Sequence, residues 1–372
     1  MNILHICSYY ENVLFENLVK ALDKQGINNE VFVFFPKEQE RQNFERERTN
    51  VVLKFCYSKK DRCIFHLKHN KVVQCFTEEY HARINNFDVI YAHSLFSNGY
   101  VAYKAKKRWG IPYIVMVQNT DLNVFFKYMK HLHSLGINIL KNASKIIFAS
   151  QSYVDEALNK YIPAKTAEEI KEKISIVPYG IDDYYFENFG NKARDNRNKC
   201  ILSVATICKN KNHILLAKAV DYLNKKSNTK NINLIIIGKF ENSGIVSKLS
   251  QFDFVQCINF MPKEELIDYF ASADIFTLVS KTETFGLVYA EALSQGCPII
   301  YSKGQGFDQQ FPEGLVGYHA NSNNYKNVAQ TIEKLMKSNV SAEICQKSAI
   351  RYRWDNISKT YYDLFCSIMQ NE

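Results

Sequence analysis

The sequence lacks several patterns that mark common classes of protein. No two of its ten cysteines are separated by the two to four residues that a zinc knuckle or a redox pair needs. No uninterrupted apolar run approaches the length of a membrane-spanning helix, and the first residues do not resemble a secretory signal. We therefore expect reduced cysteines, no structural metal and a cytoplasmic location.

The common nucleotide-binding signatures are missing as well. Neither G-x-G-x-x-G nor G-x-x-x-x-G-K-[ST] occurs, and Gly238 and Gly244 lack the paired spacing that lets a backbone approach a pyrophosphate. This argues against nicotinamide dehydrogenases and P-loop enzymes. Zinc fingers, continuous basic helices and aromatic-rich RNA-binding strands are also absent from the sequence, so we expect no nucleic acid partner.

Glycine and proline are scarce, with 21 residues together among 372, while 46% of residues are hydrophobic and 23% charged. This composition predicts a globular protein with a sizeable core, and the length favours two domains. The net charge of +9 is uneven, because residues 51–150 alone carry about +10. Such an excess suits an anionic membrane surface or a phosphate-bearing substrate; a merely solvated lysine-rich surface is the alternative.

Short apolar runs alternate with helix-like stretches along both halves of the chain, which predicts parallel sheets covered on both faces. The fold class expected is α/β, with two Rossmann-like doubly wound domains facing each other across a cleft, residues 1–180 and 181–353. A polar linker is expected at 187–199. The predicted strands are 3–7, 30–35, 51–55, 87–92, 112–117, 145–150 and 174–177, then 200–205, 231–238, 254–260, 274–279, 297–302 and 317–320; predicted helices include 15–25, 100–109, 213–224, 263–273 and 286–295.

The richest stretch for chemistry is 280–298, which follows a predicted strand and runs into a helix. If that helix opens near Phe285, its free N–H groups form an anion site suited to a diphosphate. Glu283 then lies beside the anion site, and Glu291 needs a hydrogen-bonding partner that a ribose diol would provide. On spacing alone, a structural alternative remains, in which Thr284 caps the helix and both glutamates are surface acids.

The spacing of these glutamates, with Phe285, Gly286 and Leu287 between them, closely resembles the E-x(7)-E signature of glycosyltransferase family 4. The resemblance implies the GT-B fold and sugar transfer from a nucleotide diphosphate sugar with retention at the anomeric carbon. It also implies that no metal or other cofactor is needed. Glu283 would then hold the donor sugar, Glu291 the ribose, and residues 285–287 the diphosphate.

Other donor-binding positions follow from the same resemblance. The segment 203–213 is similar to the family loop in which an Arg and a later Lys hold the diphosphate; Lys211 falls on the Lys position and Thr206 on the Arg position. Lys209 is close enough in sequence to compensate for the missing cation. The segment 255–266 would place Met261 at the nucleobase, and Gly238 would line the same pocket.

In the first half, residues 87–94 resemble the family strand that ends in a histidine near the cleft, here His93. Residues 111–121 correspond to the strand whose end usually offers a second histidine; Gln118 stands there instead. Asp121 could bind sugar or cap the segment that follows. The tail, 354–372, resembles the terminal helix that crosses back onto the first domain.

Together these features predict a retaining glycosyltransferase of the hexosyl type that uses a UDP- or GDP-sugar, with Glu283 and Lys211 as its catalytic residues. The acceptor expected is a glycan, lipid-linked, at the inner face of the cell membrane in bacterial surface polysaccharide synthesis. Two alternatives remain: a non-catalytic sugar-nucleotide-binding or scaffold subunit, suggested by Thr206 and Gln118, and a GT-B sugar-nucleotide epimerase.

Overall fold

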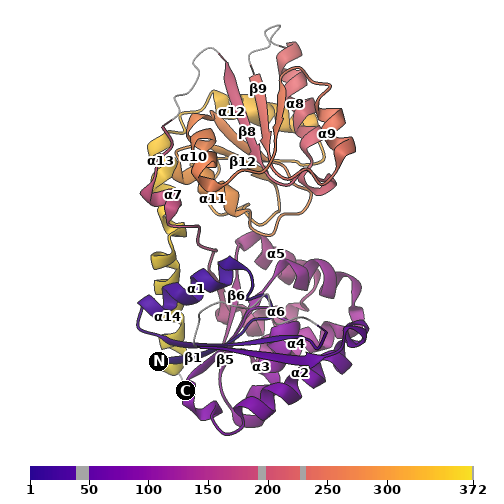
Figure 1. Ribbon diagram of the computed structural model, residues 1–372, viewed down its shortest axis with the longest axis vertical. Coiled ribbons are helices and arrows are strands. Elements are labelled where there is room, and N and C mark those ends of the chain that lie inside the picture. The colour runs from indigo at the N-terminus through magenta and orange to yellow at the C-terminus, as the bar shows by residue number, and fades with distance from the viewer. Residues whose placement is uncertain (39–49, 192–197, 227–231, 371–372) are drawn as a thin grey trace. The chain divides into compact units, whose positions relative to one another are not determined.

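The computed structural model describes residues 1–38, 50–191, 198–226 and 232–370. The chain divides into two compact units. Unit 1 comprises Met1–Ala149, Tyr153–Pro178 and Trp354–Glu372, and unit 2 comprises Ser150–Ser152 and Tyr179–Arg353. Each unit contains a parallel sheet with helices on both faces (Figure 1). The predicted class, two Rossmann-like α/β domains, is confirmed.

Among the described residues, the sheet of unit 1 has seven parallel strands in the order β3-β2-β1-β4-β5-β6-β7. They are β1 Asn2–Ile6, β2 Asn28–Pro36, β3 Val51–Tyr57, β4 Val89–Ala92, β5 Tyr113–Val117, β6 Lys145–Phe148 and β7 Ile174–Ile176. The order reverses between β1 and β4. In doubly wound sheets a ligand binds outside the carboxyl ends of the strands at such a reversal.

Helices cover both faces of this sheet. They are α1 Val13–Lys24, α2 Phe65–Tyr80, α3 Ser97–Trp109, α4 His133–Asn142, α5 Gln151–Lys160, α6 Ala164–Ile170 and α14 Trp354–Met369, with short 3-10 or π turns η2 Lys59–Cys63, η3 Ile84–Asn86, η4 Asp121–Phe126, η5 Lys130–Leu132 and η6 Lys171–Lys173. Local sequence sets their ends. Asn12 caps α1 by accepting a 3.0 Å hydrogen bond from the backbone N–H of Leu14, and α3 ends at Gly110 with φ 78°.

Strand β2 shows why the sheet is apolar on both faces. Phe32 and Phe34 pack in the core beneath α2, and the ring of Phe32 lies 5.1 Å from that of Phe76. Val31 and Val33 point to the opposite face, where they pack with Phe15 of α1. Because side chains alternate along a strand, a strand buried on both faces must be apolar at every position.

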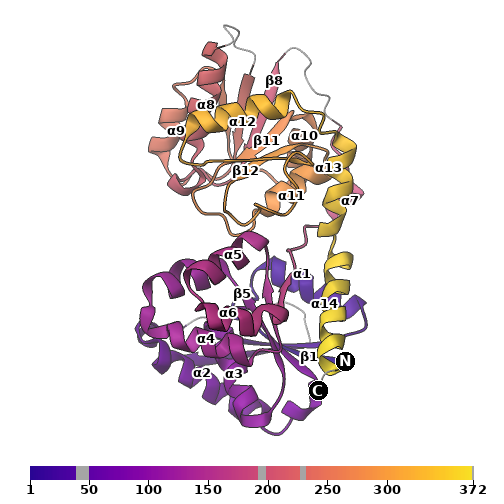
Figure 2. The same cartoon turned by 180° about the vertical axis from the view of Figure 1, so that it is seen from behind.

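Unit 2 repeats the arrangement with six described strands in the order β10-β9-β8-β11-β12-β13. They are β8 Lys199–Val204, β9 Ile232–Ile237, β10 Val255–Ile258, β11 Ile275–Leu278, β12 Ile299–Ser302 and β13 Gly317–Ala320. The helices are α7 Tyr184–Glu187, α8 His213–Lys226, α9 Ser243–Leu249, α10 Lys263–Ser272, α11 Leu287–Ser294, α12 Tyr325–Met336 and α13 Ala342–Ala349, with turns η7 Lys209–Lys211 and η8 Ile350–Tyr352. Helix α12 packs against α8 (Figure 2). The order reverses between β8 and β11.

The last helix, α14, belongs to unit 1 and lies beside α1 in both views (Figures 1 and 2). The hydroxyl of Tyr361 lies 2.7 Å from that of Tyr91 on β4, and both side chains are buried. Gln25 at the end of α1 donates a 3.2 Å hydrogen bond to the hydroxyl of Ser358. These contacts join α14 to α1 and to the sheet of unit 1.

The structure differs from the sequence-based ranges by up to three residues at the ends of strands and helices; strand β10, for example, ends at Ile258 rather than 260. Helix α3 begins at Ser97 rather than 100, and α11 begins at Leu287 rather than near 285. The predicted linker, 187–199, runs from the last residue of α7 to the first of β8, and its middle, 192–197, lies outside the described residues. Within the described part of the chain, no helix is both long and apolar enough to span a bilayer.

We expect Tyr361→Ala to lower the free energy of unfolding of unit 1 by about 3 to 5 kcal/mol, because it removes a fully buried aromatic side chain. Tyr361→Phe should cost only about 1 kcal/mol, the net value of one hydrogen bond. Urea denaturation of the full chain measures both. Tyr362→Ala, one residue along the same helix and partly exposed, is the matched control. Equal midpoints for Tyr361→Ala and Tyr362→Ala would contradict the docking of α14.

Candidate functional site

The candidate site of unit 2 lies at the carboxyl ends of β8 and β11, where the strand order reverses. Two loops leave the sheet there, one from β8 to α8 and one from β11 to α11. Paired strands end at the same edge of a parallel sheet, so residues some 70 positions apart in sequence become neighbours.

Two asparagines hold these loops together. The side chain of Asn210 donates to the carbonyl of Thr282 at 2.8 Å and accepts from its N–H at 3.1 Å. Asn212 has φ 61°, a left-handed conformation that asparagine tolerates better than most residues, and its side-chain N–H groups reach the carbonyls of Val279 and Ser322. The β8–α8 loop therefore has a fixed position relative to the end of β11.

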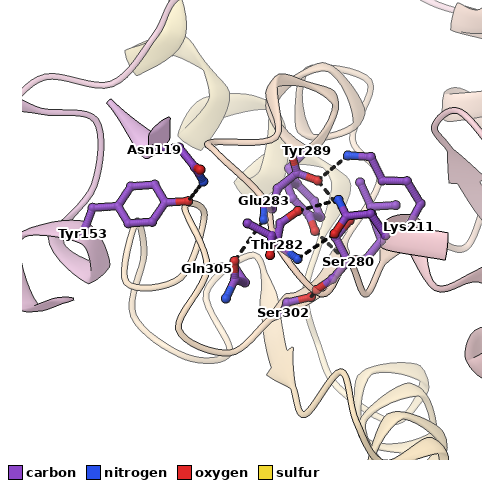
Figure 3. Close-up of polar contacts among 11 residues, drawn as sticks. Asn119, Tyr153, Lys211, Ser280, Thr282, Glu283, Tyr289, Ser302 and Gln305 are labelled. Atoms are coloured by element: carbon purple, nitrogen blue, oxygen red, sulfur yellow. Dashed lines mark hydrogen bonds and ion pairs between the residues drawn. The ribbon is translucent and has the colours of Figure 1, made fainter. Parts of the chain in front are cut away.

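Lys211 and Glu283, predicted as the catalytic residues, meet at this position (Figure 3). The ammonium Nζ of Lys211 lies 2.7 Å from the carboxylate Oε2 of Glu283, and Ser280 donates to the same oxygen at 3.0 Å. The two charged side chains are only 21% and 11% exposed. A pair so shielded from water interacts more strongly than a surface ion pair, and loss of either partner leaves the other partly buried without its counter-charge.

A third loop, after β12, supports Glu283 through its backbone (Figure 3). Gln305 accepts a 2.9 Å hydrogen bond from the N–H of Glu283, and the N–H of Gly306 donates to the Glu283 carbonyl at 3.1 Å. A Cβ on Gly306 would lie 1.9 Å from the carbonyl oxygen of Thr284, so only glycine allows this approach. Ser302 donates to the carbonyl of Ser280 at 2.7 Å.

Helix α11 opens directly after this turn. Gly286 precedes it with φ 79°, and a Cβ there would lie 2.5 Å from the ring of Tyr289. The side chain of Phe285 is buried against the rings of Tyr179 and Phe307, so only its backbone is available to a ligand. The N–H of Tyr289 already donates to the carbonyl of Gly286 at 3.0 Å, so the N–H groups of Leu287 and Val288 are those at the helix start that favour an anion. Thr284 is not the cap that the structural alternative required.

Glu291 lies in the second turn of α11 and is half-buried. Burial raises its pKa to about 7, and the hydroxyl of Tyr185 hydrogen-bonds its carboxylate and partly opposes that rise. The negative charge of Asp182 also raises the pKa, whereas Lys263, which forms an ion pair with Asp182, lowers it. The carboxylate is therefore poised between its two protonation states near neutral pH.

The remaining predicted donor residues lie on loops that leave the same edge of the sheet. Thr206 is half-buried and Lys209 exposed in the β8–α8 loop, while Met261 is half-buried after β10. Gly238 is buried at the end of β9, and a Cβ there would lie 2.1 Å from the carbonyl oxygen of Ala205. The structure places these residues on one edge, and their roles toward a nucleotide stay predictions.

In unit 1, the three predicted sugar-contacting residues follow β4 and β5. His93 is fully buried, and its Nε2 lies 2.9 Å from Nδ1 of His5. Burial holds the pKa of His93 well below its usual value, so the ring is neutral. Gln118 is half-buried and donates to the His93 carbonyl at 3.0 Å. No ring atom of His93 is accessible in this conformation, so a sugar contact there would need a rearrangement.

Asp121 is 1% exposed and accepts hydrogen bonds from three backbone N–H groups, at Leu95, Phe96 and Gln118. Burial raises its pKa to about 6, although those hydrogen bonds oppose the rise. The carboxylate thereby ties the turn after β4 to the end of β5. Of the two roles that the sequence left open, this geometry favours the structural one.

One group of side chains among the described residues has ligand atoms spaced closely enough for a metal ion: Asp308, Glu313 and His319. His319 Nδ1 lies 3.2 Å from both carboxylates, and those carboxylates also accept backbone N–H groups from Gly304 and His319. Hydrogen bonds within the protein account for the cluster, and nothing in the structure assigns a metal to it.

Several residues of the site escaped sequence reasoning, namely Asn210, Asn212, Ser280, Gln305 and Tyr185. Except for Ser280, which donates to Glu283 three residues away, each acts through contacts with residues far away in sequence, which spacing alone does not reveal. For two of these residues, Asn210 and Asn212, the run Lys209–His213 contains a sequence signal. Two asparagines between a strand and a helix indicate a turn with unusual backbone angles.

Two family models match the chain and together span most of it. The model described as Glycosyltransferase Family 4 matches residues 12–184, and the one described as Glycosyl transferases group 1 matches residues 185–352.

Among curated proteins, a D-inositol 3-phosphate glycosyltransferase of Corynebacterium urealyticum is 24% identical over 314 residues, covering 76% of this chain and 72% of that protein. The alpha-monoglucosyldiacylglycerol synthase of Acholeplasma laidlawii is 24% identical over 74% of this chain and 75% of its own length. An uncharacterized 41.2 kDa protein in the cps region of Klebsiella pneumoniae is 23% identical over 99% and 100%.

Solved structures share the fold over nearly the full length. Sucrose-phosphate synthase from Thermosynechococcus elongatus has a TM-score of 0.75 at 16% identity, covering 100% of both chains. The lipopolysaccharide outer core galactosyltransferase WaaB, in its apo form, has a TM-score of 0.76 at 16% identity and covers 99% of both. Anabaena HepE in complex with UDP has a TM-score of 0.69 at 17% identity, covering 99% and 100%.

We expect Lys211→Met to lower the free energy of unfolding of unit 2 by about 1 to 3 kcal/mol, because it leaves the Glu283 carboxylate without its counter-charge. Adding Glu283→Gln to that variant should restore part of the loss, and the double-mutant cycle should give a favourable coupling. Urea denaturation measures each value.

Lys226→Met is the matched control for this cycle, because Lys226 forms a solvent-exposed ion pair with Glu333 at 2.9 Å. It should leave stability unchanged within the precision of the measurement. Additive losses at Lys211 and Glu283 would show that the pair contributes nothing.

Proposed function

The chain belongs to glycosyltransferase family 4, and from this premise we propose that it moves a sugar from a nucleoside diphosphate sugar to a glycan acceptor with retention at the anomeric carbon. Its membership of this family makes the chain a glycosyltransferase. The observation that carries the proposal is the ion pair of Lys211 with Glu283 at the strand reversal of unit 2, next to the opening of α11. A cation, a carboxylate and a helix N-terminus gather there, which suits a diphosphate joined to a sugar.

In the proposed reaction the donor diphosphate replaces Glu283 as the partner of Lys211. Lys211 and the N–H groups at Gly286 and Leu287 then stabilise the charge that builds on the departing diphosphate, without a metal ion. Glu283, released from the lysine, accepts hydrogen bonds from donor-sugar hydroxyls and stabilises positive charge at the anomeric carbon. Ser280 and Gln305 hold its side chain and backbone in place.

The bond between the anomeric carbon and the diphosphate oxygen breaks, and the acceptor hydroxyl oxygen bonds to that carbon on the same face. The proton of the acceptor hydroxyl passes to the leaving diphosphate oxygen. Positioning of the two reactants and charge stabilisation supply the catalysis in this proposal. Thr206 provides no cation beside the diphosphate, and the exposed Lys209 supplies the second positive charge.

Glu291 is proposed to hold the ribose. Two hydroxyls of a ribose donate to one ionised carboxylate, and the hydrogen bond from Tyr185 helps to orient that carboxylate. The base and sugar would lie over Gly238 and Met261. UDP is the first donor class to test, because Anabaena HepE and the Escherichia coli trehalose-6-phosphate enzyme were solved with UDP or a UDP-sugar.

For the acceptor we propose a lipid-linked glycan used in bacterial surface polysaccharide synthesis, reached from the inner face of the cell membrane. Unit 1 exposes cations on and beyond α3, namely Lys104, Lys107, Arg108, Lys127 and Lys130, which suit an anionic membrane surface. A glucosyldiacylglycerol synthase and a cps-region protein among the relatives support this choice. Association with the membrane would be peripheral.

We expect UDP to raise the melting temperature of the chain, because a ligand that binds only the native state stabilises it. Lys211→Met should weaken UDP binding roughly ten- to hundredfold, because one charge-assisted contact with the diphosphate is lost. A thermal-shift titration with UDP, GDP, ADP and CMP makes the measurement, with Lys226→Met as the control.

The nucleotide that binds identifies the donor to be offered with acceptors. Glu283→Gln should then abolish transfer while leaving the melting transition cooperative, and the product should keep the anomeric configuration of the donor. If no nucleotide shifts the melting temperature, the donor site is wrong. Nucleotide binding without turnover in any acceptor mixture would favour the non-catalytic alternative, and donor conversion without an acceptor would favour the epimerase.

UDP affinity should increase as the pH rises through about 7, because Glu291 accepts ribose hydroxyls best as a carboxylate and its pKa is raised to about 7. The raised pKa also costs stability. Between the usual value of 4.5 and about 7, the native state binds more protons than the unfolded chain, so the penalty grows as the pH rises.

Glu291→Gln removes both effects: it should bind UDP more weakly and lose the stability penalty above about pH 7. Calorimetric titrations of the native chain and of Glu291→Gln across this range test the point. The difference between the two profiles cancels the ionisation of UDP itself. Parallel profiles would mean that Glu291 does not contact the nucleotide.

A further inference from the structure

Unit 1 contains a pocket of about 550 Å³ that the proposed donor site does not use. It opens where β1, β2 and β3 end and where α3 begins. Its lining includes Tyr9, Glu11, Tyr57, Arg62, Lys68 and Ser97. The carboxyl edge of a doubly wound sheet is where ligands bind, and the proposed donor site uses none of these residues.

Two cations line the pocket. Lys68 comes from the first turn of α2 and Arg62 from η2. The ammonium of Lys68 lies over aromatic faces, 4.9 Å from the ring centroid of Tyr57 and 5.9 Å from that of Phe34. Within the described residues neither cation forms an ion pair. Asp61, next to Arg62 in sequence, instead pairs with Lys71 at 2.8 Å and accepts the N–H of Ser58.

The protein holds Lys68 under electrostatic strain. Burial, together with the positive charge of Arg62, lowers the pKa of Lys68 from 10.5 to about 8. Faces of aromatic rings compensate a buried ammonium only in part. Among the described lining residues the two cations outnumber the one carboxylate, Glu11. An anion bound between them would relieve the repulsion.

The rest of the lining suits a phosphoryl group attached to a hydroxylated body. Arg62 offers a planar fork of N–H donors and Lys68 a point charge, which together match the several oxygens and double charge of a phosphate. Ser97 stands at the start of α3 and offers a hydroxyl, while the positive end of that helix is already matched by the Asp121 carboxylate, which accepts the N–H groups of Leu95 and Phe96. The partly exposed ring of Tyr9 and the rings of Phe34 and Tyr57 provide an apolar wall for a sugar or polyol.

We propose that this pocket binds a phosphoryl group carried by the acceptor, held between Arg62 and Lys68. That the bound molecule is an acceptor rests on the proposed transfer function. The anion site itself rests only on the residues of the pocket. Its consequence is that the enzyme selects acceptors bearing a phosphate ester. Such an ester can belong to a soluble sugar or polyol phosphate or to the headgroup of a lipid-linked glycan.

The test is calorimetric titration of inorganic phosphate into the full chain saturated with UDP, so that the diphosphate site of unit 2 is occupied. Phosphate should bind, and Lys68→Met and Arg62→Gln should each weaken its binding about tenfold or more, the loss expected for one charge-assisted contact. The control is Lys334→Met, whose ammonium lies 3.8 Å from the ring centroid of Tyr318 in unit 2. It should bind phosphate as the native chain does.

A stability measurement separates a binding role from a structural one. Without phosphate, Lys68→Met should melt at a higher temperature than the native chain, because it removes a charge that the fold disfavours. Phosphate should then raise the melting temperature of the native chain more than that of the variant. A variant that melts lower and still binds phosphate as tightly as the native chain would overturn the proposal.

Two further arms identify the source of the phosphoryl group. Glycerol 3-phosphate, a soluble monoester, is titrated as inorganic phosphate was, and vesicles containing phosphatidic acid are tested by flotation. If one of these two ligands binds the native chain and loses that binding in both Lys68→Met and Arg62→Gln, it identifies the source of the phosphoryl group. If phosphate binding is sensitive to both substitutions but UDP does not bind, the pocket stands and the donor proposal fails. If UDP binds and phosphate does not, only the pocket proposal fails.

Discussion

The ion pair between Lys211 and Glu283 is the contact on which the candidate site depends. It joins the loops after β8 and β11, which the sheet already brings to the same edge, and it sits where both side chains are largely shielded from water. The surrounding hydrogen bonds, from Asn210, Ser280 and Gln305, keep the loops at that spacing. A ligand that enters there meets groups already in position, so little ordering cost remains at binding.

The fold was predictable because its signal is local. Runs of β-branched and aromatic residues, each long enough for one strand and separated by amphipathic stretches, require a parallel sheet covered on both faces. The sequence pointed to Glu283, Glu291 and Lys211 through the family resemblance, and the structure brings Lys211 and Glu283 together, while the roles of all three toward a donor stay predictions. The partners that position them were not, because Asn212, Gln305 and Tyr185 act across gaps in sequence that only the folded sheet closes. Burial could not be predicted either. The ring of His93 and the carboxylate of Asp121 lie inside unit 1, and sequence spacing does not show this.

The two units place a lysine in opposite electrostatic surroundings. In unit 2 the protein supplies Lys211 with a carboxylate, so the ligand-free site is electrostatically balanced and a diphosphate must compete with Glu283. In unit 1 Lys68 rests on aromatic rings beside Arg62 and remains unbalanced. A balanced site favours discrimination, because a ligand must offer more than charge to displace the carboxylate. An unbalanced site favours capture, because any suitable anion improves on the empty pocket.

The position of α14 has a consequence for how the chain is made. Unit 1 is built from the first and the last residues, and Tyr91 and Tyr361, which contact each other in its core, are 270 positions apart. During synthesis the nascent chain emerges N-terminus first, so the sheet of unit 1 forms long before the helix that covers it has been translated. Nearly all of unit 2, residues 179–353, is one uninterrupted segment and can finish folding while the ribosome is still adding α14. Until α14 has been made and has packed beside α1, an apolar face of unit 1 remains open to chaperones and proteases.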